Sequence, residues 1–132
     1  MFSAGCAFII PVGTQEQNHY TIILNDAESD MEAVLVTLTS QPLYYQTHVF
    51  PAGSRIFGNQ QKLAKDSYVC CHKLRIESTF ELRELAQYSH FTHLGYVSTV
   101  VLETLRETVA SSDGTPPEIL RKLRGLGLIP EE

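Results

Sequence analysis

The stretch HYTIILNDAESDMEAVLVTLTS, residues 19–40, decides the fold class. Its two ends, 19–26 and 33–40, alternate their side chains with the period of two that is typical of β-strands. Residues 33–40 carry apolar side chains on both faces, as a strand in the middle of a sheet or barrel does. The acidic segment between them, 26–32, predicts a turn or loop. The stretch therefore predicts two strands, the second of them central.

Further short strands are predicted on both sides of this pair. GCAFIIPVG at 5–13 is an apolar strand stopped by Pro11 and Gly13, THVF at 47–50 is a short strand, and DSYVCCHKLRI at 66–76 is a long one. PAGSRIFGNQQ, which follows THVF, carries Pro and two Gly and predicts a turn or mobile loop. Five or six short strands joined by turns before any helix favour a small, strongly curved β-barrel.

The periodicity changes to that of helices after residue 76. ESTFELRELAQY predicts a helix capped by Ser78 or Thr79. TPPEILRKLRGLGLI predicts another, with Thr115 as its N-cap and Pro at the first helical position. Between them, GYVSTVVLETLRETVASSDG predicts a helix with an apolar stripe of Val101, Leu102, Leu105 and Val109. The sequence therefore predicts one α+β domain over 1–132, with a β-barrel core at 1–76 and a helical segment at 77–132.

The composition places the chain in an ordinary class of protein. Its 132 residues are 43% hydrophobic and 19% charged, as expected of a globular domain. No apolar run approaches the ~20 residues of a membrane span, and the start of the chain lacks the basic region of a signal peptide. Three cysteines cannot complete a disulfide set, which favours a reducing compartment. We therefore expect a cytoplasmic protein that does not enter a membrane.

The charge is unevenly distributed although the net charge is only −5. Between residues 45 and 76 a single acid, Asp66, stands against five basic side chains: Arg55, Lys62, Lys65, Lys73 and Arg75. A phosphate backbone responds to such a local patch and not to the total charge. The patch is thus either a polyanion site or a solvated basic surface without a partner.

The segment KDSYVCCHKLRI contains adjacent cysteines and a histidine. Neighbours on a strand point to opposite faces, so Cys70 and Cys71 cannot readily share a metal, whereas Cys70 and His72 share a face. Two ligands are too few for a structural metal, and no metal is expected. The pattern favours buried cysteines that act as small hydrophobes. His90 and His93 in SHFTH lack a third ligand, and a polar helix start is the alternative.

The order of these segments resembles the PemK/MazF-type toxins. In that family a strand with a Ser/Asn/Asp-rich turn precedes a strand that ends in ITS, and here the second strand ends in LTS, residues 38–40. A PG turn before a SYV strand and a closing helix also occur in the family. The resemblance covers roughly residues 8–109 and is carried by HYTIILNDAESD, EAVLVTLTSQ, HVFPAGS, KDSYVCCHKLRI and LGYVSTVVLETLRETV.

The resemblance implies a bacterial type II toxin–antitoxin protein with an SH3-like barrel of five to seven strands and appended helices. Members often form homodimers, are neutralised by a small antitoxin protein, and cleave single-stranded RNA without a metal or other cofactor. Such cleavage needs a base for the ribose 2′-OH, an acid for the leaving 5′-oxygen and cations that stabilise the transition state. The resemblance therefore implies a metal-independent endoribonuclease.

The family pattern assigns roles to polar and basic residues of this chain. Members often carry an Arg-x-Asp pair on the strand that matches YVCCHKLR, and here those places hold Val, Cys or His. We expect His72 to replace the acid or the base, Arg55 or Arg75 to supply the cation, and His48 to be a further catalytic residue. The residues expected to contact RNA are His19, Thr39, Ser40, Lys62, Lys65, Lys73 and Arg75. A noncatalytic SH3-like barrel that binds RNA or a protein partner fits the same residues.

Overall fold

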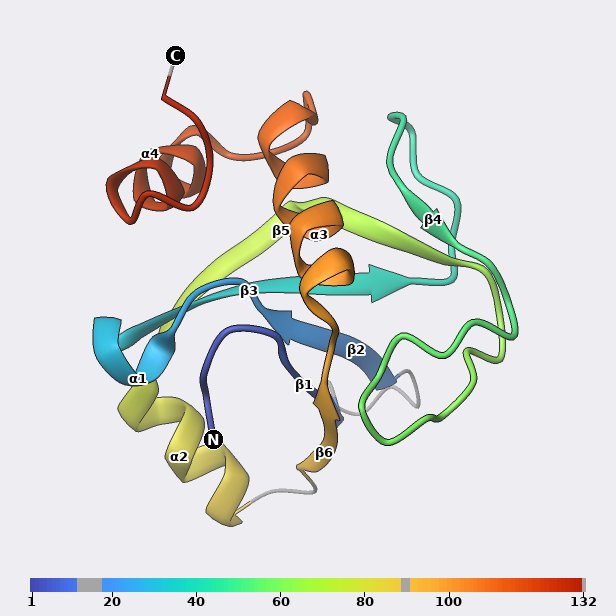
Figure 1. The fold of residues 1–132 in the computed structure, drawn as a ribbon, viewed down its shortest axis with the longest axis horizontal. Coiled ribbons are helices and arrows are strands. Elements are labelled where there is room, and N and C mark those ends of the chain that lie inside the picture. The colour runs from blue at the N-terminus through green and yellow to red at the C-terminus, as the bar shows by residue number, and fades with distance from the viewer. Residues whose placement is uncertain (12–17, 89–90, 132) are drawn as a thin grey trace.

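The computed structural model describes residues 1–11, 18–88 and 91–131. Its centre is one curled sheet of six antiparallel strands in the order β4-β5-β3-β2-β1-β6 (Figure 1). The strands are β1 (Cys6–Pro11), β2 (Asn18–Ile23), β3 (Glu32–Thr39), β4 (Val49–Phe50), β5 (Ser67–Ser78) and β6 (Thr92–Tyr96). The helices are α1 (Ala27–Asp30), α2 (Thr79–Tyr88), α3 (Thr99–Ser111) and α4 (Pro117–Gly125). The predicted α+β class and the five to seven strands are confirmed, and the predicted barrel is observed as a curled half-barrel with β4 and β6 at its two edges.

The central strand β3 separates two apolar layers. Val34, Val36 and Leu38 point into a main core that α3 and α4 cover. Ala33 and Leu35 point to the other face, into a smaller core closed by α2 and the N-terminal residues. All five side chains are almost fully buried, and each large one contributes about 1.5–3 kcal/mol. The two-sided apolar pattern of residues 33–40 is therefore confirmed as the mark of a central strand.

Strand β5 is strongly bent where it crosses β3. Leu35 pairs with Arg75 and Thr37 with Cys70, so residues 71–74 of β5 lie opposite Val36 alone. Figure 1 shows the resulting bend of β5 next to α3 and α4. Extra residues in one strand leave ladder groups without a strand partner and increase the local twist. The bend exposes backbone groups near Cys71, which bears on the candidate site.

The loop 51–66 bridges the two edges of the curled sheet. Its neck is closed by backbone hydrogen bonds from Gly53 N to Leu63 O and from Leu63 N to Ser54 O. Its tip reaches β6, where Asn59 N donates to Leu94 O at 3.0 Å. Ile56 and Phe57 of this loop are buried in the main core. The segment predicted as a turn or mobile loop is therefore a connection between β4, β5 and β6.

The glycines at this contact allow the loop to approach β6 closely. Gly95 has a φ of +85°, which a residue without a Cβ adopts at little cost. A Cβ on Gly95 would lie 2.9 Å from the Cα of Gly58. The close approach of two backbones therefore explains a glycine inside the short strand β6.

Three predicted helices are confirmed, with differences at their starts. In α2, Ser78 Oγ accepts from Glu81 N at 3.1 Å, as the predicted cap does. The predicted N-cap of α4 is wrong: Thr115 donates its hydroxyl to Val109 O, and Pro116 occupies the cap position without a side-chain bond. Pro117 stands at the start of the helix as expected. The core positions of the α3 stripe, Leu102, Leu105 and Val109, are buried.

Two elements differ from the sequence expectation. The acidic segment 26–32 contains the short helix α1, whose Asp26 side chain accepts from Glu28 N and Ser29 N. The segment 77–132, expected to be helical throughout, also contains β6, which pairs with β1. His93 therefore lies on a strand and not at a helix start, while His90 lies outside the described residues.

None of the helices in the described part of the chain is long and apolar enough to span a bilayer.

Candidate functional site

Tyr45 and His72 form a hydrogen-bonded cluster at the bend of β5. The Tyr45 oxygen accepts from Cys71 N at 2.7 Å and from His72 N at 3.1 Å. The same oxygen lies 2.8 Å from His72 Nδ1. Strand β4 is only two residues long, so it leaves this part of β5 without a strand partner. The phenol therefore occupies the backbone donors that the bend of β5 exposes.

The geometry fixes which nitrogen of the neutral His72 ring carries the proton. A phenol oxygen has two lone pairs and one proton, and the two backbone N–H groups of Cys71 and His72 occupy the lone pairs. The Tyr45 proton must then point to Nδ1, which acts as an acceptor. The Cys70 thiol lies 3.7 Å from the same nitrogen. Nε2 therefore carries the hydrogen and is the ring's free donor.

The Tyr45 phenol keeps its proton at neutral pH. Burial raises the pKa of Tyr45 above its ordinary value, and the backbone hydrogen bonds from His72 and Cys71 offset only part of this effect. A neutral phenol can donate to His72 Nδ1, whereas a phenolate could not. Tyr45 is further held by Gly114, since a Cβ there would lie 2.9 Å from its ring. The phenol is thus held in place and remains protonated.

An exposed aromatic ring packs against the cluster, and an exposed basic residue follows His72 in the chain. Tyr44 is 84% exposed, and its ring centroid lies 4.8 Å from that of Tyr45 and 5.7 Å from that of His72. Lys73 follows His72 in the chain and is exposed. We call Tyr44, Tyr45, His72 and Lys73 together the Tyr–His surface. It combines an open ring face, a fixed imidazole donor and a cation.

Three of the predicted residues gather further along β5. Thr39 of β3 and Val49 of β4 both pair with Tyr68, from opposite sides. Ser40 follows Thr39, and His48 precedes Val49, with both side chains exposed. The carbonyl of His48 accepts from Val69 N, three positions before His72. About 10 Å of strand therefore separates the His48 backbone from that of His72.

The other predicted residues are more dispersed. Arg55 and Lys62 flank the neck of the loop 51–66, away from the bend of β5, and both are exposed. Lys65 is exposed at the end of the same loop. Lys73 and Arg75 are both exposed while Leu74 is buried, which confirms that they project from the side opposite the apolar residues. The structure therefore separates Arg55 from His72.

Arg75 and His19 are the remaining predicted RNA contacts. Arg75 Nε is 3.8 Å from a carboxylate oxygen of Glu77, so its charge is partly offset. His19 is half-buried on β2 and pairs with Ile10 of β1. Strand β3 lies between β2 and β5 in the sheet, so His19 is separated from the Tyr–His surface. Both residues remain predictions as RNA contacts.

The three cysteines are free and buried. Cys71 points into the main core, and Cys70 lies beside His72, as the alternation of the strand predicted. Burial raises the pKa of Cys6 to about 11 and also raises that of Cys71. Thiols of this kind are poor nucleophiles. Within residues 1–11, 18–88 and 91–131, no three His, Cys, Asp or Glu side chains are placed to hold a metal ion.

Sequence reasoning missed Tyr44 and Tyr45. They belong to QPLYYQ, which carries neither a strand nor a helix pattern. The one available signal was a pair of adjacent aromatic residues directly before a short strand. Their role depends on the bend of β5, which the pairing register with β3 creates.

No family model matches the sequence, and no curated protein or solved structure matches it with statistical significance.

Proposed function

We propose that this protein binds single-stranded RNA across the Tyr–His surface. The observation that carries the proposal is the Tyr45–His72 hydrogen bond, which leaves Nε2–H of His72 as a fixed donor. A fixed donor beside a cation suits a phosphate oxygen, because charge-assisted hydrogen bonds to phosphate are strong. An open tyrosine ring suits an unstacked base. The combination favours a single strand over a duplex.

The charge around this surface supports a polyanion as the ligand. Asp66 is the single acid among residues 45–76, and its carboxylate already accepts from Ala52 N at 2.8 Å. Lys73 adjoins His72, and the other basic residues of this segment are exposed. The local surplus attracts phosphates although the whole chain is acidic.

Binding is tested by fluorescence anisotropy with a labelled single-stranded RNA in EDTA. Tyr44→Ala removes the stacking ring, and loss of one base–aromatic stack costs about 1–3 kcal/mol, or roughly 5- to 150-fold in affinity. Phe80→Ala is the matched control, since Phe80 is an exposed aromatic residue on α2. Equal affinity of Tyr44→Ala and wild type, or a stronger effect of Phe80→Ala, would refute the proposal.

Metal-independent cleavage of the bound RNA is the second candidate function. His72 is a poor general base in this arrangement, because its lone-pair nitrogen already accepts from Tyr45. The ring of His48 packs against Phe50 at 4.6 Å, and no hydrogen bond of its ring nitrogens is found among the described residues. His48 is therefore the better candidate for the base, and His72 for the donor to the phosphate.

Cleavage is tested with a long single-stranded RNA in EDTA. We expect wild-type protein to cut it, and His48→Ala to remain folded and inactive. His93→Ala is the control, since His93 is an exposed histidine on β6. RNA that stays intact at high protein concentration would exclude cleavage and leave RNA binding as the function. The antitoxin partner, the homodimer and the cationic roles of Arg55 and Arg75 stay predictions of the family resemblance.

A further inference from the structure

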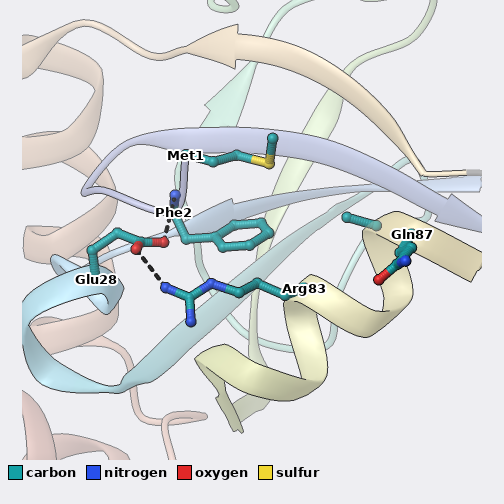
Figure 2. A pocket seen from close by; sticks show the side chains of 6 residues that line it. Met1, Phe2, Glu28, Arg83 and Gln87 are labelled. Carbon is teal, nitrogen blue, oxygen red and sulfur yellow. Dashed lines mark hydrogen bonds and ion pairs between the residues drawn. The ribbon is translucent and has the colours of Figure 1, made fainter.

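A pocket lies on the opposite side of the sheet from the main core, between the N-terminal residues, α1 and α2. Its volume is about 420 Å³. Figure 2 shows the Phe2 ring between Met1 and Arg83, and Phe2 is only 1% exposed, so it forms the floor. Arg83 donates to Glu28 at 2.7 Å across one side of the pocket. The pocket is large enough for one or two apolar side chains of a ligand.

Two large apolar side chains are exposed beside this pocket. Met31 is 65% exposed and so is Phe80. Their backbones lie close together, because Thr79 N, next to Phe80 in the chain, donates to the carbonyl of Met31 at 3.1 Å. Phe80 lies one turn before Arg83 on α2, which connects this pair to the pocket. Exposed apolar side chains around a concave site are typical of protein-binding surfaces.

Met31 adopts a backbone conformation that disfavours its side chain. Its φ is +63° at the C-terminal cap of α1, a position where Gly or Asn is preferred. A methionine there costs stability and gains no burial in the free protein. An exposed apolar residue in a strained backbone conformation suggests that the side chain has a role in binding.

The rim of this surface is strongly acidic. Residues 26–32 and 77–84 contain seven carboxylates, of which three already have a cationic partner: Glu28 pairs with Arg83, Glu77 with Arg75, and Glu32 with Lys122 of α4. Burial and the neighbouring Glu81 raise the pKa of Glu77. Closely spaced carboxylates repel one another, and a cationic ligand would relieve this repulsion. The seven are Asp26, Glu28, Asp30, Glu32, Glu77, Glu81 and Glu84.

We propose that this surface docks a basic amphipathic helix of a partner protein. The apolar face of that helix packs against Met31, Phe80 and the pocket floor, and its Lys and Arg side chains lie over the carboxylates. Charge complementarity and the apolar centre together select this ligand. The same carboxylates repel RNA, so the docking surface and the Tyr–His surface take ligands of opposite charge.

The test uses a labelled synthetic helix of about 18 residues with Leu and Lys at amphipathic spacing. A peptide with Glu in place of every Lys is the charge control. We expect the protein to bind the Lys peptide and not the Glu peptide. The double variant Met31→Asn/Phe80→Ser should bind the Lys peptide with about tenfold lower affinity than wild type. Val100→Ser is the matched apolar control, because Val100 is 73% exposed at the start of α3. Backbone amide shifts should concentrate on α1, α2 and residues 1–3.

A second variant pair separates specific docking from general attraction. Glu81→Gln/Glu84→Gln should weaken the Lys peptide, whereas Glu103→Gln/Glu107→Gln on α3, which removes the same charge, should not. Equal weakening by both pairs, or equal affinity of wild type and Met31→Asn/Phe80→Ser, would overturn the proposal. So would concentration-dependent self-association that Phe80→Ser abolishes, because the surface would then be an interface between copies of this chain.

Discussion

Replacement of Tyr45 by Phe removes one oxygen from the centre of the Tyr–His surface. The oxygen accepts two backbone N–H groups and bonds His72 Nδ1. Cys71 is fully buried, so leaving its N–H without an acceptor costs about 1–2 kcal/mol of stability. The N–H and Nδ1 of the half-buried His72 can bond water instead, which costs less. We expect a total loss of about 2–3 kcal/mol in the free energy of unfolding, or roughly 10 °C in Tm at this chain length.

Urea denaturation followed by circular dichroism measures this loss. Tyr44→Phe is the matched control, since its 84% exposed side chain has no hydrogen bond among the described residues, and it should change stability by less than about 0.5 kcal/mol. Nitrogen NMR of the imidazole should also show loss of the Nε2–H tautomer preference in Tyr45→Phe. A Tyr45→Phe protein as stable as Tyr44→Phe would refute the assigned hydrogen bonds.

Three further predictions concern other parts of the fold. Met31→Asn should raise the free energy of unfolding by about 0.5–1 kcal/mol, because Asn tolerates the φ of +63°; destabilisation in urea would contradict this. Gly95→Ala should cost about 3 kcal/mol through strain and a 2.9 Å approach to Gly58, whereas Gly53→Ala, with φ +88° and open space, should cost about 1 kcal/mol; equal costs would contradict the loop contact. Cys6, with its pKa raised from 9.0 to about 11, keeps its proton in the folded state while the unfolded chain loses it. Stability should therefore fall by about 2 kcal/mol between pH 9 and pH 11 relative to Cys6→Ala; a constant difference between the two proteins would exclude this linkage.

Strands were predictable from the sequence where both of their faces are buried or where they are long. Residues 33–40 and 66–76 carry enough apolar side chains to define β3 and β5 from local sequence alone. The helices α2, α3 and α4 follow from caps, proline and periodicity. These patterns lie within about one turn or one strand, so they can be recognised without knowledge of the tertiary fold.

The missed elements depend on contacts between distant residues. Strand β6 is short and contains Gly95, whose presence is explained by the loop 51–66 against it. Helix α1 has only four residues, which is too short for a helical period to show in the sequence. The Tyr–His surface depends on the register shift between β3 and β5, which no local pattern encodes. Long-range pairing therefore sets most of the candidate site.

The candidate residues were chosen by their charge and by the family resemblance. In the fold, several of them lie far from one another. His72 was chosen as an acid or base by its position on the strand, and its role as a donor emerges from the bond with Tyr45. Arg55 was placed with it because both belong to the basic segment, whereas the structure holds Arg55 at the neck of the loop 51–66. Composition identifies the charge of a segment but not which of its side chains meet.

Ultraviolet cross-linking to a single-stranded RNA, followed by mass spectrometry of the peptides, tests whether the Tyr–His surface binds RNA. We expect cross-links on the peptides that contain Tyr44–Tyr45 and His72–Lys73, and their loss in Tyr44→Ala. Cross-links confined to the loop 51–66 or to α2, or their complete absence at RNA concentrations that saturate an RNA-binding control protein, would contradict this expectation.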